Sequence, residues 1–173
     1  ILASGPSMSA SVAETVRSAV RYRVIVVNNT FRLAPWADLL YAADQMWWKE
    51  YAKEALAFAG LKVTCMDNAY PEVLKLREGA KEGFDPDPAV VCTGGTSGYQ
   101  ALNVAVHAGC KRIPLCACDT HGTHWHERHV SPLRDHGEAL YPKWIARFKT
   151  LVAPLAALGV EVINCTPGSL LDT

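Results

Sequence analysis

The residues best suited to chemistry form a histidine-rich stretch in the second half of the chain. Four histidines lie within nine residues, namely His121, His124, His126 and His129. Asp119 precedes them and His136 follows them. Histidine exchanges a proton readily near neutral pH. The stretch could therefore supply a general base or acid, and its candidates are His126, His129 and His124, with Asp119 beside them.

Two other interpretations of the same stretch stay open. The spacing of His124 and His126 is His-x-His, which can chelate zinc. No helical i, i+4 spacing presents these histidines, however, and no cysteine or second acidic cluster completes a set of ligands. We therefore assign no metal ligand. The stretch could also be a solvated loop without a chemical role.

The remainder of the chain must position these residues, and it alternates between two patterns. Apolar or β-branched runs predict strands at residues 1–4, 23–27, 39–43, 62–66, 89–92, 112–118 and 160–164. Helical patterns occupy residues 8–20, 46–59, 99–108 and 144–158. This alternation predicts one α/β domain over residues 1–173, with a mostly parallel sheet and helices on both faces. Prolines and glycines mark 67–88 as a surface insertion, with a short helix near 72–79.

Polar clusters follow nearly every predicted strand. They are Ser4-Gly5-Pro6-Ser7, Asn28-Asn29-Thr30, Asp44, the loop 93–98, Asp119 and the stretch 164–169. The carboxyl ends of parallel strands share one edge of a sheet, so the clusters should converge on one crevice. Two of them are small-residue loops that open helices, and a helix N-terminus favours an anion. The sequence thus predicts a phosphate-binding crevice.

Individual residues in these clusters allow more than one role. Gly5 lets a ligand approach the backbone, and Ser7 could cap the following helix or donate to phosphate. The same turn could also be an ordinary strand-to-helix connection. Asp44 could bind a ribose hydroxyl or cap the next helix. Trp47 and Trp48 could stack on a base, but their helical spacing favours the core.

Composition narrows the classes of partner. Seventeen basic residues balance 17 acidic ones, so no long-range field draws the protein to nucleic acid or an anionic membrane. No apolar run reaches the ~18 residues of a membrane span, and residues after Ile1 lack the charged n-region and long h-region that are typical of a signal peptide. The sequence begins with Ile1 and not with a methionine, so we expect that its N-terminus has been trimmed. The six cysteines include no Cys-x-x-Cys pair and are expected as core thiols of a cytoplasmic protein.

The order of the motifs resembles a known superfamily. It runs Ser-Gly-Pro-Ser, Val-Asn-Asn, Thr-Ser-Gly-Tyr-Gln-Ala, Ala-Gly-Cys-Lys-Arg-Ile-Pro-Leu, the histidine-rich loop, and Asn-Cys-Thr-Pro-Gly-Ser-Leu-Leu. This order is similar to that of the superfamily containing 6-hydroxymethylpterin diphosphokinase-like proteins and Campylobacter-type bacterial sialyltransferases. The phage- and prophage-encoded branch is the most similar, which implies a bacterial host. The resemblance implies a Rossmann-like three-layer α/β/α domain.

The resemblance also implies roles for particular residues. In the sialyltransferases the equivalent loops hold the nucleotide of the sugar donor, which carries over to Gly5, Pro6, Ser7, Ser97 and Gly98, with Ser4 and Thr96 beside them. A base contact matches Asn28 or Asn29, and the general base matches His126 or His129. The chain departs from the sialyltransferases in having Ser4 and Asp44 where they have asparagine. Their assisting tyrosines have no clear match, and His121 or His124 would stand in.

Together these observations predict a nucleotide-dependent transferase. It would move a glycosyl group from a nucleotide-sugar, or a diphosphate from a nucleoside triphosphate, to a hydroxyl acceptor. A triphosphate donor would require Mg²⁺, with Asp44 or Asp119 as its carboxylate. The alternatives are a metal-dependent hydrolase that uses the cluster 121–129, and a non-catalytic phage nucleotide-binding protein. The tryptophan-rich helix and the segment 67–88 are candidate contacts of a homo-oligomer.

Overall fold

The computed structural model describes residues 1–19, 21–67, 70–126, 129, 131, 133 and 137–171. His136, noted beside the histidine-rich stretch, lies outside the described residues. The described part is a mixed α/β structure, as the alternation of patterns predicts. Within it, no helix combines the length and the hydropathy that crossing a bilayer requires.

Every strand pairing among the described residues is parallel. The strands β1 (Ile25–Val27), β2 (Leu39–Tyr41), β3 (Leu61–Thr64) and β4 (Val73–Lys75) form one sheet in sequence order. Two further pairs join β5 (Arg77–Glu78) to β6 (Val90–Val91), and β7 (Arg112–Leu115) to β8 (Glu161–Asn164). The predicted strands are present at their expected places, but most are shorter than the sequence pattern.

The N-terminal segment links β1 to the end of β7. Leu2 forms parallel bridges to both Val26 and Cys116. Its amide donates to the carbonyl of Ile25 at 2.8 Å, and the amide of Ala3 donates to the carbonyl of Cys116 at 2.9 Å. The strand predicted for residues 1–4 is thus reduced to these bridges, and Ser4 lies directly beyond them.

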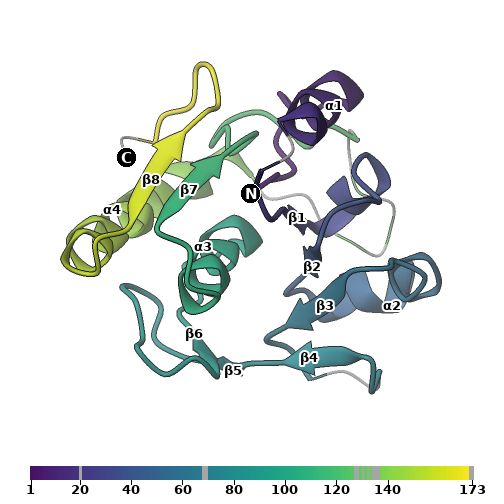
Figure 1. The fold of residues 1–173 in the computed structure, drawn as a ribbon, viewed down its shortest axis with the longest axis horizontal. Helices are drawn as coiled ribbons and strands as arrows, with labels where there is room; N and C mark the ends of the chain where they lie inside the picture. Colours follow the sequence, from purple (N-terminus) through teal and green to yellow (C-terminus); the bar gives the residue numbers. More distant parts are fainter. Residues whose placement is uncertain are drawn as a thin grey trace.

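Helices pack against both faces of the strands. The longer helices are α1 (Ala10–Ser18), α2 (Gln45–Ala55), α3 (Ser97–His107) and α4 (Tyr141–Ala157), and the short 3-10 helices are η1 (Asn28–Arg32) and η2 (Glu138–Leu140). Figure 1 shows α3 inside the curve that the strands describe, with α2 outside it. Every residue of α3 from Gly98 to Ala105 is accordingly buried.

The pleat of the strands divides the core into two clusters. On β1, Ile25 and Val27 belong to the cluster that α3 and α4 cover, whereas Val26 belongs to the cluster that α1 and α2 cover. Successive side chains of a strand point to opposite faces, so one buried strand serves both clusters. This explains why β1 is an uninterrupted β-branched run.

Two expectations about local structure are wrong. The short helix expected near 72–79 is replaced by β4 and β5, because Val73 and Leu76 are buried and the amide of Leu76 donates to the carbonyl of Thr64. The strand expected over 112–118 ends at Leu115, since Ala117 adopts a left-handed φ of 55°. The segment 67–88 therefore contributes two strands as well as loops.

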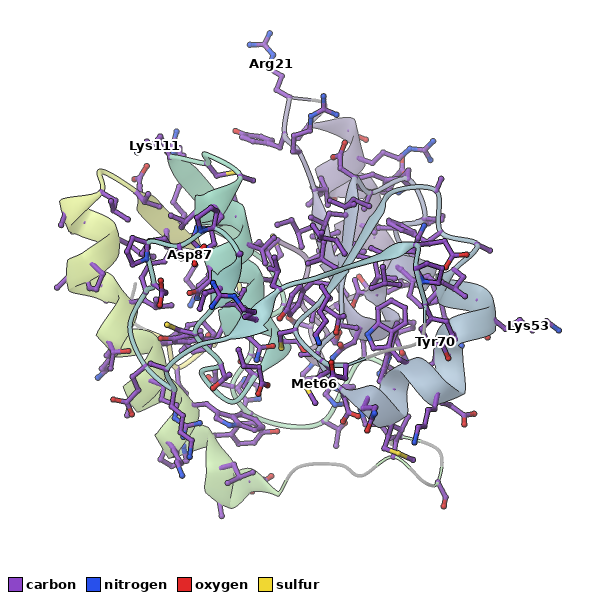
Figure 2. The ribbon with its side chains drawn as sticks, turned by 90° about the horizontal axis from the view of Figure 1, so that it is seen from below. Arg21, Lys53, Met66, Tyr70, Asp87 and Lys111 are labelled. Carbon is purple, nitrogen blue, oxygen red and sulfur yellow. The ribbon has the colours of Figure 1, made fainter. Side chains whose placement is uncertain are left out.

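Several charged side chains project from the outside of the molecule. Arg21, Lys53 and Lys111 project from its periphery in Figure 2, from three separate parts of the chain.

The six cysteines are free thiols, and Cys65 and Cys92 are buried as the sequence predicts, while Cys165 is exposed.

Candidate functional site

A cavity of about 580 Å³ lies where the loops after the strands meet. Most of the predicted site residues line it: Ser4, Gly5, Asn28, Asp44, Thr96, Ser97, Gly98, Asp119, His124 and His129. His121 lines it as well. Four predicted residues do not line it, namely Pro6, Ser7, Asn29 and His126. Its volume is that of a pocket for a small organic ligand.

The N-terminus of α3 opens into this cavity. Thr96 is the N-cap, and its side chain accepts a hydrogen bond from the amide of Tyr99 at 3.2 Å. The amides of Ser97 and Gly98, which come before Tyr99, donate to no acceptor among the described residues. Such amides at the first turn of a helix bind anions, and the helix dipole adds to the attraction.

A cation that the sequence analysis missed lies beside this helix end. Arg147, on α4, donates from one guanidinium nitrogen to the carbonyl of Gly94 at 3.1 Å. Its buried Nε has no hydrogen-bond partner among the described residues. The helical pattern placed Arg147 on α4 without indicating which loop it would reach. Its charge reinforces the preference of the 93–98 loop for an anion.

Asp119 occupies the turn formed by residues 4–7, which follows the N-terminal bridges. This carboxylate is 3% exposed, and its Oδ2 accepts hydrogen bonds from the Ser7 hydroxyl at 2.9 Å and from the Ser7 amide at 3.4 Å. The amide of Gly5 donates to the carbonyl of Ala117 at 2.9 Å. A negatively charged carboxylate therefore occupies the turn before α1. Of the N-termini of α1 and α3, the one of α3 is the better phosphate site.

The structure shows which residues cap α1 and α2. Ser9, and not Ser7, is the N-cap of α1, since its side chain accepts from the amide of Val12. Asp44 is the N-cap of α2, because its Oδ1 accepts from the amides of Met46 at 2.6 Å and Trp47 at 3.2 Å. Asp44 is nevertheless exposed and lines the cavity, so its capping role leaves its second oxygen accessible.

The two adjacent asparagines have different roles. Asn29 is 1% exposed, and its Oδ1 accepts a hydrogen bond of 2.6 Å from the indole nitrogen of Trp47. Asn28 lines the cavity, and its Oδ1 is buried with no hydrogen-bond partner among the described residues. An orphaned buried acceptor costs about 1–3 kcal/mol, which a ligand N–H or O–H could recover. Asn28 is therefore the ligand-facing member of the pair.

Backbone strain is concentrated around the cavity. Among the described residues, three that are not glycine have positive φ: Asn28 at 48°, Ala117 at 55° and Thr120 at 58°. All three line the cavity. This conformation costs about 1–2 kcal/mol for a residue with a Cβ, and such strain collects at functional sites. Nothing in the sequence pattern marks these positions, because the strain arises where several strands end together.

Three histidines of the predicted catalytic stretch form a cluster, and two of them line the cavity. The rings of His124, His126 and His129 have centroids 4.6–5.1 Å apart. Nδ1 of His124 lies 3.3 Å from the carbonyl oxygen of Ser4. His121 is exposed and stands outside this group. The stretch is therefore an organised cluster that contacts the first turn of the chain.

His126 differs from its two neighbours. Burial, and then the nearby His124 and His129, lower its pKa to about 4, so it is neutral at pH 7. His126 also does not line the cavity, whereas His124 and His129 do. A base of such low pKa accepts a proton poorly at neutral pH. Of the two candidates for general base, His129 has the better position.

The sequence analysis missed an aromatic side of the cavity. Tyr141, Trp144 and Phe148 line it from the start of α4. Tyr141 and Trp144 pack edge to face with ring centroids 5.4 Å apart. Their spacing along α4 could have indicated a shared face, but the helical pattern alone did not show that this face meets a cavity. Trp47 and Trp48 are core residues, each 1% exposed, although Trp47 also lines part of the cavity.

Comparison with protein-family models, with curated proteins and with solved structures finds no match to this chain.

Proposed function

We propose that the cavity binds a nucleotide, and that the protein is a nucleotide-dependent transferase with a Rossmann-like three-layer domain. One observation carries the proposal. The open amides of Ser97 and Gly98 face the same cavity as the orphaned acceptor of Asn28 and the imidazole of His129. An anion site, a hydrogen-bond acceptor and a group that can carry protons are what transfer from a nucleotide donor requires.

The phosphate end of the donor belongs at α3. The amides of Ser97 and Gly98 would donate to phosphate oxygens, and Arg147 behind the loop would add positive charge. Gly98 is buried but lines the cavity, and a Cβ added there would make an ordinary contact of 3.8 Å with Sγ of Cys118. The nucleoside would extend toward Asn28 and Asp44.

The acceptor end belongs at the histidines. His129, or His124 beside it, would take the proton of an acceptor hydroxyl as that oxygen attacks the donor. The transferred group is a glycosyl unit or a diphosphate, in keeping with the resemblance of the motif order to both kinds of transferase. A triphosphate donor would bring Mg²⁺, and Asp44 would be its carboxylate because Asp119 is hydrogen-bonded to Ser7.

A nucleotide panel tests the proposal directly. We expect one of CMP, CTP, UDP, GDP and ATP to raise Tm by about 5–10 °C at a hundred times its Kd. A shift that persists in EDTA with CMP or UDP would favour glycosyl transfer. A shift only with a triphosphate and Mg²⁺ would favour diphosphate transfer. If no nucleotide moves Tm under either condition, the proposed function is wrong.

The substitution Ser97→Pro removes one proposed phosphate donor without breaking the helix. Ser97 is the first residue of α3, where proline is tolerated, and Thr96 before it is already extended at φ −143° and ψ 145°. Loss of an N–H bond to a charged phosphate costs about 1.5–3 kcal/mol. We expect nucleotide affinity, measured by calorimetry, to fall about 10–100-fold.

The matched control is Ser97→Ala, which keeps the amide and removes only the hydroxyl. We expect its affinity to stay within about threefold of the parent chain and both variants to keep their circular dichroism spectra. Parent-like affinity in a folded Ser97→Pro variant would show that the α3 amide does not contact phosphate.

A further inference from the structure

We propose that His124, His126 and His129 form a binding site for one Zn²⁺ ion at the acceptor end of the cavity. One nitrogen from each of these imidazoles lies within 4.8 Å of the corresponding atom of the other two. Three histidines make a sufficient set of protein ligands for zinc when the fourth position is left to water or substrate. The inference rests on the proposed function for its role, but not for the metal itself.

The chain brings these ligands together without a helix. Residues 121–126 form turns and a bridge, so the side chains of His124 and His126 stack with their ring planes 24° apart. His129 then lies against both rings, with centroids 4.6 Å from His124 and 4.9 Å from His126. The absence of helical spacing in the sequence therefore does not prevent the three imidazoles from converging.

The surroundings orient two of the ligands. Nδ1 of His124 faces the carbonyl oxygen of Ser4 at 3.3 Å. When that nitrogen carries the proton, Nε2 keeps its lone pair, and a histidine held in this way by a carbonyl is the usual arrangement around zinc. Nε2 of His126 is buried and has no hydrogen-bond partner among the described residues. A metal ion would satisfy this nitrogen.

The ligand type selects the metal. Imidazole nitrogen suits zinc and its neighbours in the transition series, whereas Mg²⁺ and Ca²⁺ prefer oxygen. The set lacks a thiolate or a carboxylate, and the nearby carboxylate of Asp119 is already hydrogen-bonded to Ser7. Zinc is therefore the expected occupant, and it would be distinct from any Mg²⁺ that accompanies a triphosphate.

The position of the site suggests how it would act. His124 and His129 line the cavity and His126 does not, so a metal held by the three imidazoles would be adjacent to the cavity. An oxygen bound there would have its pKa lowered by the metal charge. In the proposed transferase this oxygen belongs to the acceptor hydroxyl, and its proton would leave to water as the oxygen attacks the donor and the nucleotide departs. When Zn²⁺ is bound, His124 and His129 would be its ligands, and the metal would activate the hydroxyl in place of an imidazole base.

Metal analysis of the untagged chain, purified without chelator, tests the site. We expect about one Zn²⁺ per chain by mass spectrometry, and a tetrahedral Co²⁺ absorption spectrum after exchange. His126→Ala and His129→Ala should each weaken Zn²⁺ binding at least about 100-fold, since loss of outer-shell partners alone costs 10–100-fold. His121→Ala, in the same loop but outside the cluster, is the control and should bind as tightly as the parent chain.

The result that overturns the site is a folded parent chain that neither retains Zn²⁺ nor changes its Co²⁺ spectrum on titration. This measurement uses the unaltered protein, so it tests the zinc site even where a variant fails to fold. Nucleotide-induced Tm shifts, measured both with Mg²⁺ and in EDTA, separate the two proposals. A shift without metal binding would leave the nucleotide site standing, and metal binding without any shift would leave the zinc site standing.

Discussion

Gly5→Ala is expected to lower the free energy of unfolding by about 3 kcal/mol or more. A Cβ at this position would lie 2.0 Å from Oδ2 of Asp119 and 2.6 Å from the carbonyl oxygen of Ala117. The Ala117 carbonyl is backbone and already accepts the hydrogen bond of the Gly5 amide, so it cannot move aside without losing that bond. Displacing Asp119 would break its contacts with Ser7.

Urea denaturation of Gly5→Ala measures this effect, and Gly98→Ala is its control. The added methyl at Gly98 meets only Sγ of Cys118 at 3.8 Å, and the residue is helical. Alanine at this helical position should stabilise the chain by up to about 1 kcal/mol. A Gly5→Ala variant within about 1 kcal/mol of the parent would mean that the first turn is not packed on Asp119.

Trp47→Ala is expected to cost about 3–5 kcal/mol of stability. The side chain is 1% exposed and packs edge to face with Phe31 and Trp48, at ring centroid distances of 6.1 and 5.1 Å. Trp47→Phe should cost less, about 1–3 kcal/mol. It restores part of the packing but leaves Oδ1 of buried Asn29 without the indole donor.

The control is Trp144→Ala, at a half-buried tryptophan in the cavity wall. We expect a smaller loss of stability than at Trp47 and a clear loss of nucleotide affinity, because an aromatic wall stacks on a base or sugar. Chemical denaturation and calorimetry together give both quantities for each variant. If Trp144→Ala destabilised the fold as much as Trp47→Ala, with no change in nucleotide affinity, the two tryptophans would both be structural.

Local sequence patterns are enough to predict the alternation of strands and helices and the positions of the polar clusters. Both follow from local patterns: a β-branched run such as residues 24–27 forms a strand buried on both faces, and small polar residues follow where it ends. The strand pairings among the described residues are parallel, and the clusters that follow β1, β6 and β7 line one cavity although these strands belong to three separate sheets. The convergence of Asn28, Ser97 and His129 on one cavity agrees with the expectation from the sequence.

Which polar groups remain available to a ligand depends on how distant parts of the chain pack together. Asp119 and Ser7 are 112 residues apart, and their hydrogen bond fills the turn that the sequence favoured for phosphate. The neighbouring asparagines diverge because Trp47 reaches one of them and not the other. Arg147 and the three-histidine cluster depend likewise on side chains meeting across loops. A local pattern carries no information about such partners, because each contact is set by how separate elements pack.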